Sequence, residues 1–135
     1  MVIDDTSGFI DTNILVYANL ALSPFHAQAV ERLHSLNDCN VDLWISRQIL
    51  REYLVAMTRP GDLTGQIPIP SLVEDVRYFS DRFCVAEENP EVTEQLMLLM
   101  EQIPTSGRQI HDANIVAIMQ VYSIQNLLTH NVADF

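Results

Sequence analysis

Short apolar runs alternate along the chain with longer stretches in which apolar residues recur at intervals of three and four positions. The short runs, bounded by turn residues, are typical of buried strands, and the longer spacing is typical of one face of a helix. The predicted strands are 8–11, 41–45, 83–86 and 126–129. The predicted helices are 24–36, 47–58, 72–82, 90–103 and 109–122, with 13–18 as a helix or a loop. Because strands alternate with helices, we expect an α/β fold in which helices cover both faces of a parallel sheet.

Several of the predicted helices follow residues that are typical of helix starts. Ser23 stands before Pro24, which suits the first position of a helix, and Ser71 has the spacing of a capping box with Glu74. The residues expected to begin helices are Ser23, Ser46, Ser71 and Asn89. Residues 60–68, rich in proline and glycine, are expected to form a long surface loop.

The length and hydropathy of the chain indicate one domain with one hydrophobic core. The chain has 135 residues, which is enough to bury such a core without disulfides or a structural metal. Its hydrophobic share is 48%, yet no apolar stretch approaches the roughly 20 residues that cross a bilayer. The opening segment MVIDDTSG is acidic with no basic residue, the reverse of a secretory signal. We therefore expect a cytoplasmic protein with no membrane segment.

The two cysteines and the basic residues exclude several kinds of site. Cys39 and Cys84 lack the spacing of a zinc site or a disulfide framework, so we expect free, mostly buried thiols. All seven basic residues are arginines, which excludes P-loop phosphate transfer, Schiff-base chemistry and every other mechanism that needs a lysine. The net charge of −11 argues against avid, nonspecific binding of nucleic acid. It does not argue against a nuclease whose carboxylates hold divalent cations, because the bound metal inverts the local charge.

Three carboxylates are the candidates for chemistry. Asp11 ends the first predicted strand, where ligands of α/β sheets bind, although a turn or cap residue would also stand there. Glu52 lies on a helix face of mixed polarity, so a solvated surface glutamate is the alternative. Asp112 lies in the first turn of a helix and stacks on Ile115 and Val116. Such a carboxylate either caps the helix or points into a polar pocket, because burying its charge alone is costly.

A shared cation would let these three carboxylates lie close together. Hard oxygen ligands favour Mg²⁺ or Mn²⁺, and such an ion could activate water for an in-line phosphoryl displacement. After the last predicted strand, Asn131 and Asp134 reach the same edge, although Asp134 could equally be a frayed solvent residue.

Four segments in order along nearly the whole chain resemble the PIN domain, and their spacing is similar to that of the VapC-type toxins of bacterial toxin–antitoxin pairs. The segments are FIDTNILVYA at 9–18, the run from Ile45 to Glu52, HDA at 111–113 with small apolar residues after it, and LTHNVADF at 128–135. Proteins of this family usually continue past the Asp-Phe pair into a last strand, whereas this sequence stops at Phe135.

The resemblance implies a fold, an activity and a set of site residues. The fold is a single PIN-like domain over residues 1–135, with three layers and a central parallel sheet of four or five short strands. The activity is that of a Mg²⁺-dependent endoribonuclease, with Mn²⁺ as an alternative cofactor. The implied metal ligands are Asp11, Glu52, Asp112 and Asn131, and the implied catalytic set is Asp11, Glu52, Asp112 and Asp134. The implied supporting residues are Thr12, Asn13, Ser46 and Thr129.

The resemblance also implies the partners: an RNA substrate, a second copy of the chain in a homodimer, and a small antitoxin whose tail enters the active-site groove. Whether Asn131 or Asp134 completes the site stays open.

Other function classes are less consistent with the sequence. A PIN fold that binds a partner without turnover is the main alternative, and magnesium binding without RNA cleavage would favour it. An aspartyl phosphatase would need a second aspartate at position 13 and a lysine, and neither is present. A dinucleotide-binding domain would need a glycine fingerprint, but Gly8, Gly61, Gly65 and Gly107 are scattered.

Overall fold

A four-stranded parallel sheet lies at the centre of the molecule, as the sequence predicts. The computed structural model describes residues 6–61 and 67–130. The strands are β1 (Ser7–Ile10), β2 (Asp42–Ser46), β3 (Cys84–Ala86) and β4 (Asn126–Leu128). Their order across the sheet is β3-β2-β1-β4, and all three pairings are parallel.

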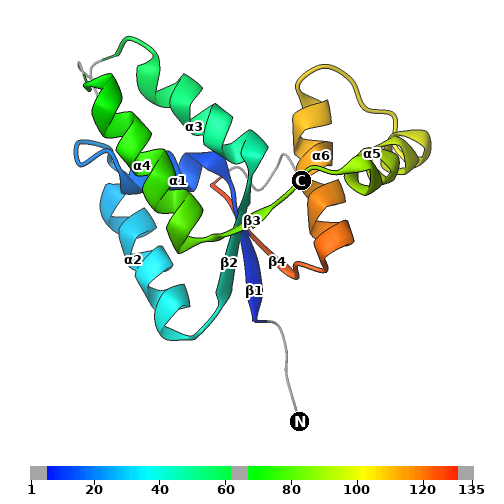
Figure 1. Cartoon of the computed structure of the whole chain (residues 1–135), viewed down its shortest axis with the longest axis horizontal. Helices are drawn as coiled ribbons and strands as arrows, with labels where there is room; N and C mark the ends of the chain where they lie inside the picture. Colours follow the sequence, from blue (N-terminus) through cyan, green and yellow to red (C-terminus); the bar gives the residue numbers. More distant parts are fainter. Residues whose placement is uncertain (1–5, 62–66, 131–135) are drawn as a thin grey trace.

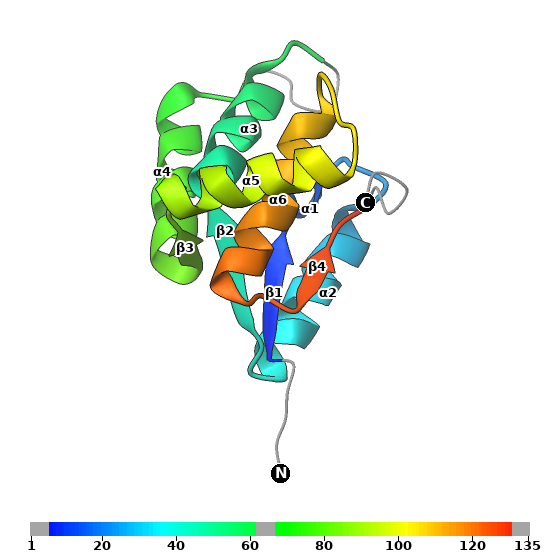
Figure 2. The same cartoon turned by 90° about the vertical axis from the view of Figure 1, so that its right-hand side faces the viewer.

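Six helices in the described part of the chain cover both faces of the sheet. They are α1 (Thr12–Ala18), α2 (His26–Asp38), α3 (Arg47–Thr58), α4 (Ile69–Arg82), α5 (Pro90–Gln102) and α6 (Gln109–Tyr122). Figure 1 shows α1 to α4 on one side of the sheet and the pair α5 and α6 on the other. Figure 2, turned by 90°, shows α5 and α6 crossing in front of the strands. The three-layer α/β fold is thereby confirmed.

The path of the chain creates a switch point between β1 and β4. From β1 the chain passes through helices on one face to β2 and then to β3, always in the same direction across the sheet. From β3 it passes through α5 and α6 on the other face and enters β4 on the far side of β1. In such sheets the crevice for a ligand opens beyond the carboxyl ends of the two strands at the switch point. We therefore expect the functional site where β1 and β4 end.

The core joins the sheet to both helical layers. Phe9 and Ile45, in the two central strands, are fully buried, and Ile118 of α6 packs over one face of the sheet. On the other face Tyr53 of α3 is fully buried, and its hydroxyl donates a hydrogen bond of 2.7 Å to Asp75 of α4. This bond satisfies the polar end of a large core side chain and ties two helices together.

Two of the expected helix starts are wrong. Ser23 does not begin α2: its hydroxyl accepts a hydrogen bond from the backbone of Phe25, its carbonyl accepts one from His26, and the resulting turn delays the helix to His26. Ser71 does not cap α4, which begins at Ile69, so Ser71 lies inside the first turn. The capping box with Glu74 therefore does not form at that start.

The other two starts are placed as expected, although they differ in their hydrogen bonds. Asn89 precedes α5 and its side chain accepts a hydrogen bond of 3.1 Å from the backbone N–H of Val92. Ser46 precedes α3, but its side chain makes no capping hydrogen bond. Its fully buried Oγ has no hydrogen-bond partner among the described residues.

The two thiols differ from the sequence prediction in their exposure. Cys39 and Cys84 are free, as expected, but both are exposed, so their predicted burial is wrong. Cys39 follows the end of α2, and Cys84 begins the edge strand β3, where side chains reach solvent. In the predicted loop, residues 60–61 and 67–68 are in neither helix nor strand, and 62–66 lie outside the described residues. None of the helices in the described ranges is long and apolar enough to cross a membrane.

Candidate active site

Asp11 stands at the switch point and is held by both strands that meet there. It follows β1 in an extended conformation and precedes α1. Its backbone N–H donates to the carbonyl of Leu128 in β4 at 2.9 Å. Its carboxylate accepts a hydrogen bond from the backbone of Thr12 at Oδ1 and another from the hydroxyl of Thr129 at Oδ2, both at 2.8 Å. The carboxylate is therefore fixed at the carboxyl edge of the sheet.

Thr12 connects Asp11 to Glu52. While its backbone N–H binds Asp11, its hydroxyl donates to Oε1 of Glu52 at 2.7 Å. The other oxygen of Glu52, Oε2, accepts from the side-chain amide of Gln48 one turn earlier in α3, at 3.0 Å. Glu52 is thus an oriented, half-buried group rather than a solvated surface glutamate.

A polar network behind Glu52 includes residues that the sequence analysis did not identify. Gln48 is 5% exposed, and its side-chain oxygen accepts a hydrogen bond of 2.9 Å from Asn114 of α6. Glu88, which follows β3, accepts hydrogen bonds from the backbone of Gln48 at 2.8 Å and from Asn114 at 3.1 Å. These contacts connect α3, α6 and the segment after β3. The signal available in the sequence was the four-residue interval between Gln48 and Glu52 and the acidic pair that follows a strand.

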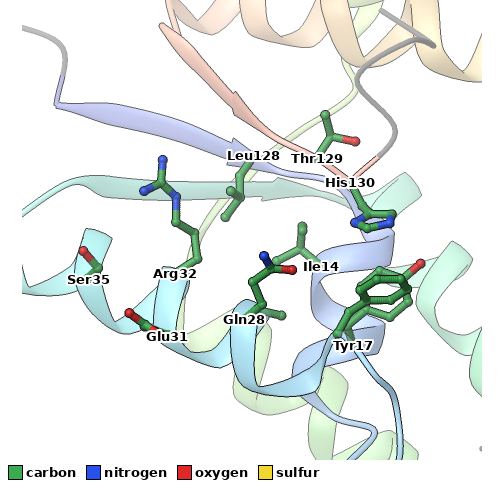
Figure 3. A pocket seen from close by; sticks show the side chains of 11 residues that line it. Ile14, Tyr17, Gln28, Glu31, Arg32, Ser35, Leu128, Thr129 and His130 are labelled. Carbon is green, nitrogen blue, oxygen red and sulfur yellow. The ribbon is translucent and has the colours of Figure 1, made fainter.

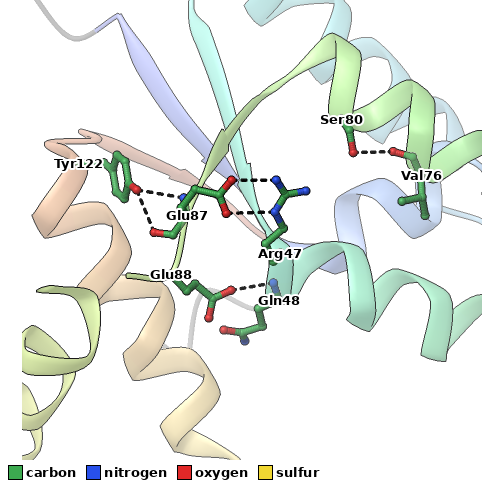
Figure 4. A network of polar contacts seen from close by, with 7 residues as sticks. All are labelled: Arg47, Gln48, Val76, Ser80, Glu87, Glu88 and Tyr122. Atoms are coloured by element: carbon green, nitrogen blue, oxygen red, sulfur yellow. Dashed lines mark hydrogen bonds and ion pairs between the residues drawn. The ribbon is translucent and has the colours of Figure 1, made fainter. Parts of the chain in front are cut away.

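The segment after β3 is fixed by further contacts, shown in Figure 4. Arg47 binds both carboxylate oxygens of Glu87, at 3.1 and 2.8 Å. The hydrogen bond from Arg47 lowers the pKa of Glu87 and raises the pKa of Arg47 from their ordinary values. The hydroxyl of Tyr122 accepts from the backbone N–H of Glu87 and donates to its carbonyl. Arg47 and Glu87 therefore form an exposed ion pair.

Asp112 occupies a different position from Glu52. It is half-buried in the first turn of α6 and lines a hollow of about 260 Å³ beside α5, together with Leu99 and Val116. Glu52 lines another hollow, of about 390 Å³, with Gln48, His111 and Asn114. Within residues 6–61 and 67–130, no group of three acidic, histidine or cysteine side chains is placed to hold a metal ion together. The structure therefore links Asp11 with Glu52 through Thr12, and the three-carboxylate metal site stays a prediction.

The remaining predicted residues lie at the same edge or outside the described ranges. The side-chain oxygen of Asn13 accepts a hydrogen bond of 3.3 Å from the backbone of His130, so it orients the segment after β4. Ser46 ends β2 at that edge but is fully buried. Asn131 and Asp134 lie outside the described residues.

The chemistry of the site suits a hard divalent cation. Asp11 and Glu52 offer carboxylate oxygens, with the hydroxyls of Thr12 and Thr129 beside them. Carboxylates and other hard oxygen groups are the ligands that Mg²⁺ and Mn²⁺ prefer. These oxygen donors therefore fit Mg²⁺ or Mn²⁺, the cofactors expected from the sequence.

Comparison with solved structures identifies toxins with the same fold. A structure of the toxin VapC20 from Mycobacterium tuberculosis, described as cleaving the sarcin-ricin loop, aligns with a TM-score of 0.72 at 20% identity, over 94% of this chain and 92% of that one. A chain of a toxin–antitoxin complex from Klebsiella pneumoniae aligns with a TM-score of 0.64 at 20% identity, over 95% and 89%.

A third similar structure belongs to VapBC2 from Rickettsia felis, bound to a DNA fragment from its promoter. It aligns with a TM-score of 0.59 at 17% identity, over 93% of this chain and 89% of that one. No model of a known protein family matches the sequence, and no curated protein matches it. The three likenesses confirm the predicted resemblance at the level of the fold.

Proposed function

We propose that this chain, which has the fold of VapC toxins, is a Mg²⁺-dependent endoribonuclease and the toxin of a type II toxin–antitoxin pair. The observation that carries the proposal is the pair of oriented carboxylates, Asp11 and Glu52, joined through Thr12 at the switch point of the sheet. Solved structures with this fold include a toxin that cleaves the sarcin-ricin loop, which supports RNA as the substrate class.

The residues of the site divide into ligands and groups that position them. Asp11, Glu52, Asp112 and Asn131 would hold Mg²⁺, with Asp134 as a further catalytic carboxylate. When bound, the cation supplies Lewis acidity and lowers the pKa of a water molecule for attack on a phosphodiester.

The positioning groups fix the ligands before any cation arrives. Thr12 and Thr129 hold the two oxygens of Asp11, while Thr12 and Gln48 hold those of Glu52. Because these hydrogen bonds set the carboxylates in place beforehand, little rearrangement is needed during the reaction.

The proposal includes two protein partners. Two similar structures are a toxin–antitoxin complex and a VapBC2 assembly on promoter DNA, which supports a small antitoxin as the partner of this chain. We also propose a homodimer, for which light scattering of the purified protein should give about twice the chain mass of 15.3 kDa. Its place of action would be the cytoplasm, where RNA is available.

The experiment that tests the activity is incubation of the purified protein with structured and unstructured RNAs in Mg²⁺, Mn²⁺ or EDTA. We expect cleavage in either metal and none in EDTA, because carboxylates alone do not activate water for this reaction. Magnesium binding without cleavage of any RNA would contradict a ribonuclease and favour a protein that only binds partners.

A further inference from the structure

A second hollow, which we call the α2 pocket, opens beside the candidate active site. It has a volume of about 540 Å³ and lies between α1, α2 and the end of β4. Thr129 lines it, and the hydroxyl of the same residue donates to Asp11 at 2.8 Å. One residue therefore separates the α2 pocket from a proposed metal ligand. Figure 3 shows the pocket from close by.

Three rings form one end of the α2 pocket. The rings of Phe25 and His130 pack in a tilted arrangement, with ring centroids 4.4 Å apart and planes inclined by 49°. Tyr17 packs against both, at 5.0 Å from Phe25 and 5.3 Å from His130. Phe25 and Tyr17 are half-buried and His130 is exposed, so part of this ring cluster faces solvent. Nucleobases stack on such rings with little regard for sequence, because every base has a π-face.

Polar groups from α2 line the α2 pocket beyond the ring cluster. Gln28, Glu31 and Arg32 are exposed and follow one another at helical spacing, so they share one face of the helix. Figure 3 shows the side chains of Gln28 and Arg32 reaching from α2 toward the end of β4. Among residues 6–61 and 67–130, no carboxylate lies within ion-pair distance of Arg32.

These groups match the edge of a nucleobase. Arginine donates to the oxygen and nitrogen acceptors of a base, glutamate accepts from its amino or imino groups, and glutamine does both. Together with the ring cluster, these three residues offer stacking and edge recognition in one hollow. The volume is within the range of small-ligand sites and leaves room for a base.

We propose that the α2 pocket binds one unpaired nucleobase of the RNA, next to the phosphate that is cut at Asp11. This inference rests on the proposed ribonuclease function; it makes Arg32 a specificity-determining residue and Phe25 a stacking platform for the base. The base stacks on Phe25 and His130, and its edge meets Arg32, Gln28 and Glu31. An unpaired base is required because a paired one has its edge engaged with its partner strand.

The first arm of the test measures binding without catalysis. AMP, GMP, CMP and UMP are titrated into the full chain in EDTA while the NMR resonances of the protein are followed. We expect the resonances of His130 and Arg32 to move, and to move most for one of the four nucleotides. Phe25→Leu should weaken that binding about tenfold and Arg32→Gln about fivefold. Arg77→Gln, which removes the same charge from an exposed position on α4, should leave it unchanged.

The second arm uses single-stranded RNA with one base removed at successive positions around the cleaved bond. Removal of one base should raise KM about tenfold in the wild type, and Phe25→Leu should be insensitive to that same removal. Equal sensitivity of wild type and Phe25→Leu, or nucleotide shifts that avoid the α2 pocket, would overturn the inference. Nucleotide binding in the α2 pocket without cleavage of any RNA would instead contradict the proposed ribonuclease function. The assignment of the pocket as a nucleobase site would then still hold.

Discussion

Thr12 positions two carboxylates of the site, because its backbone N–H donates a hydrogen bond to Asp11 and its hydroxyl donates one to Glu52. It joins residues that lie far apart in the sequence, which is why its role could be expected from a family resemblance but not worked out from spacing. The resemblance placed Thr12 and Thr129 among the supporting residues, and the structure shows what each of them holds. Gln48 and Glu88 were missed because their hydrogen bonds depend on how α3 packs against the segment after β3.

Replacement of Thr12 by valine tests this positioning role. Valine keeps the shape of the side chain but cannot donate to Glu52, so RNA cleavage should fall about 10-fold to 100-fold and more Mg²⁺ should be needed for half-maximal rate. Thr12→Ser should restore both values, because the hydroxyl is restored. Thr93→Val, at an exposed position of α5, is the matched control. A Thr12→Val enzyme with the rate and Mg²⁺ dependence of the wild type would show that the hydroxyl is dispensable.

Replacement of Asp112 by asparagine tests whether that carboxylate belongs to the site. The amide keeps the shape and loses the charge, so we expect an intact fold without ribonuclease activity. In EDTA the variant should melt at or above the wild type, because one repelling charge has been removed. It should also lose most of the stabilisation that Mg²⁺ gives to the wild type. Melting curves in EDTA and across a Mg²⁺ series measure this; a less stable variant with an unchanged Mg²⁺ response would make Asp112 a structural cap.

At the scale of elements, helix periodicity was the most reliable guide. The bounds predicted for α6, 109–122, agree with the structure, and the other helices and strands were placed within a few residues. The predicted helix starts were less reliable. A serine that stands before a proline, or three residues before a glutamate, does not always cap a helix. The local sequence is compatible with a helix that begins after the serine and with one that begins elsewhere. Contacts with the rest of the fold decide where the helix begins. Exposure of Cys84 was missed for a related reason, since the place of β3 at the edge of the sheet follows from topology.

The start of α5, which Asn89 caps, can be compared by mutation with the start of α4, which Ser71 does not cap. Asn89→Ala removes the side-chain acceptor of the Val92 N–H and should lower the free energy of unfolding by about 1 kcal/mol. Ser71→Ala should change it by much less, because Ser71 lies within the first turn of α4 and does not cap it. Urea denaturation of both variants measures the difference. Equal destabilisation by the two substitutions would show that the capping bond of Asn89 contributes nothing particular to α5.

At the scale of the molecule, both the chain and its proposed RNA substrate carry negative charge, so they repel each other over long distances. The chain carries a net charge of −11 at pH 7, so its affinity for RNA cannot rest on a broad basic surface. Bound cations at the carboxyl edge of the sheet and the arginine of the α2 pocket would supply local attraction instead. Composition excluded lysine chemistry, but it could not place the site, which depends on the order of the strands.

Expression in a bacterial host tests the molecule in its proposed role. We expect synthesis of the chain alone to slow growth, because cleavage of cellular RNA stops protein synthesis, and a small co-expressed antitoxin to relieve the effect. A Glu52→Gln chain produced at the same level should be much less toxic. Normal growth with abundant, folded and unpartnered wild-type protein would contradict the toxin assignment. Growth curves with immunoblots for the amount of protein provide the measurement.

In the proposed function, a cation held at the Asp11 and Glu52 carboxylates cleaves RNA. The measurement that tests it most directly is the single-turnover cleavage rate of an end-labelled RNA across a Mg²⁺ series, for wild type, Glu52→Gln and the exposed control Glu94→Gln. We expect the wild-type and Glu94→Gln rates to rise together and saturate, while Glu52→Gln is slower by about 100-fold or more at every concentration. Cleavage by Glu52→Gln at the wild-type rate, or undiminished wild-type cleavage in EDTA, would contradict it.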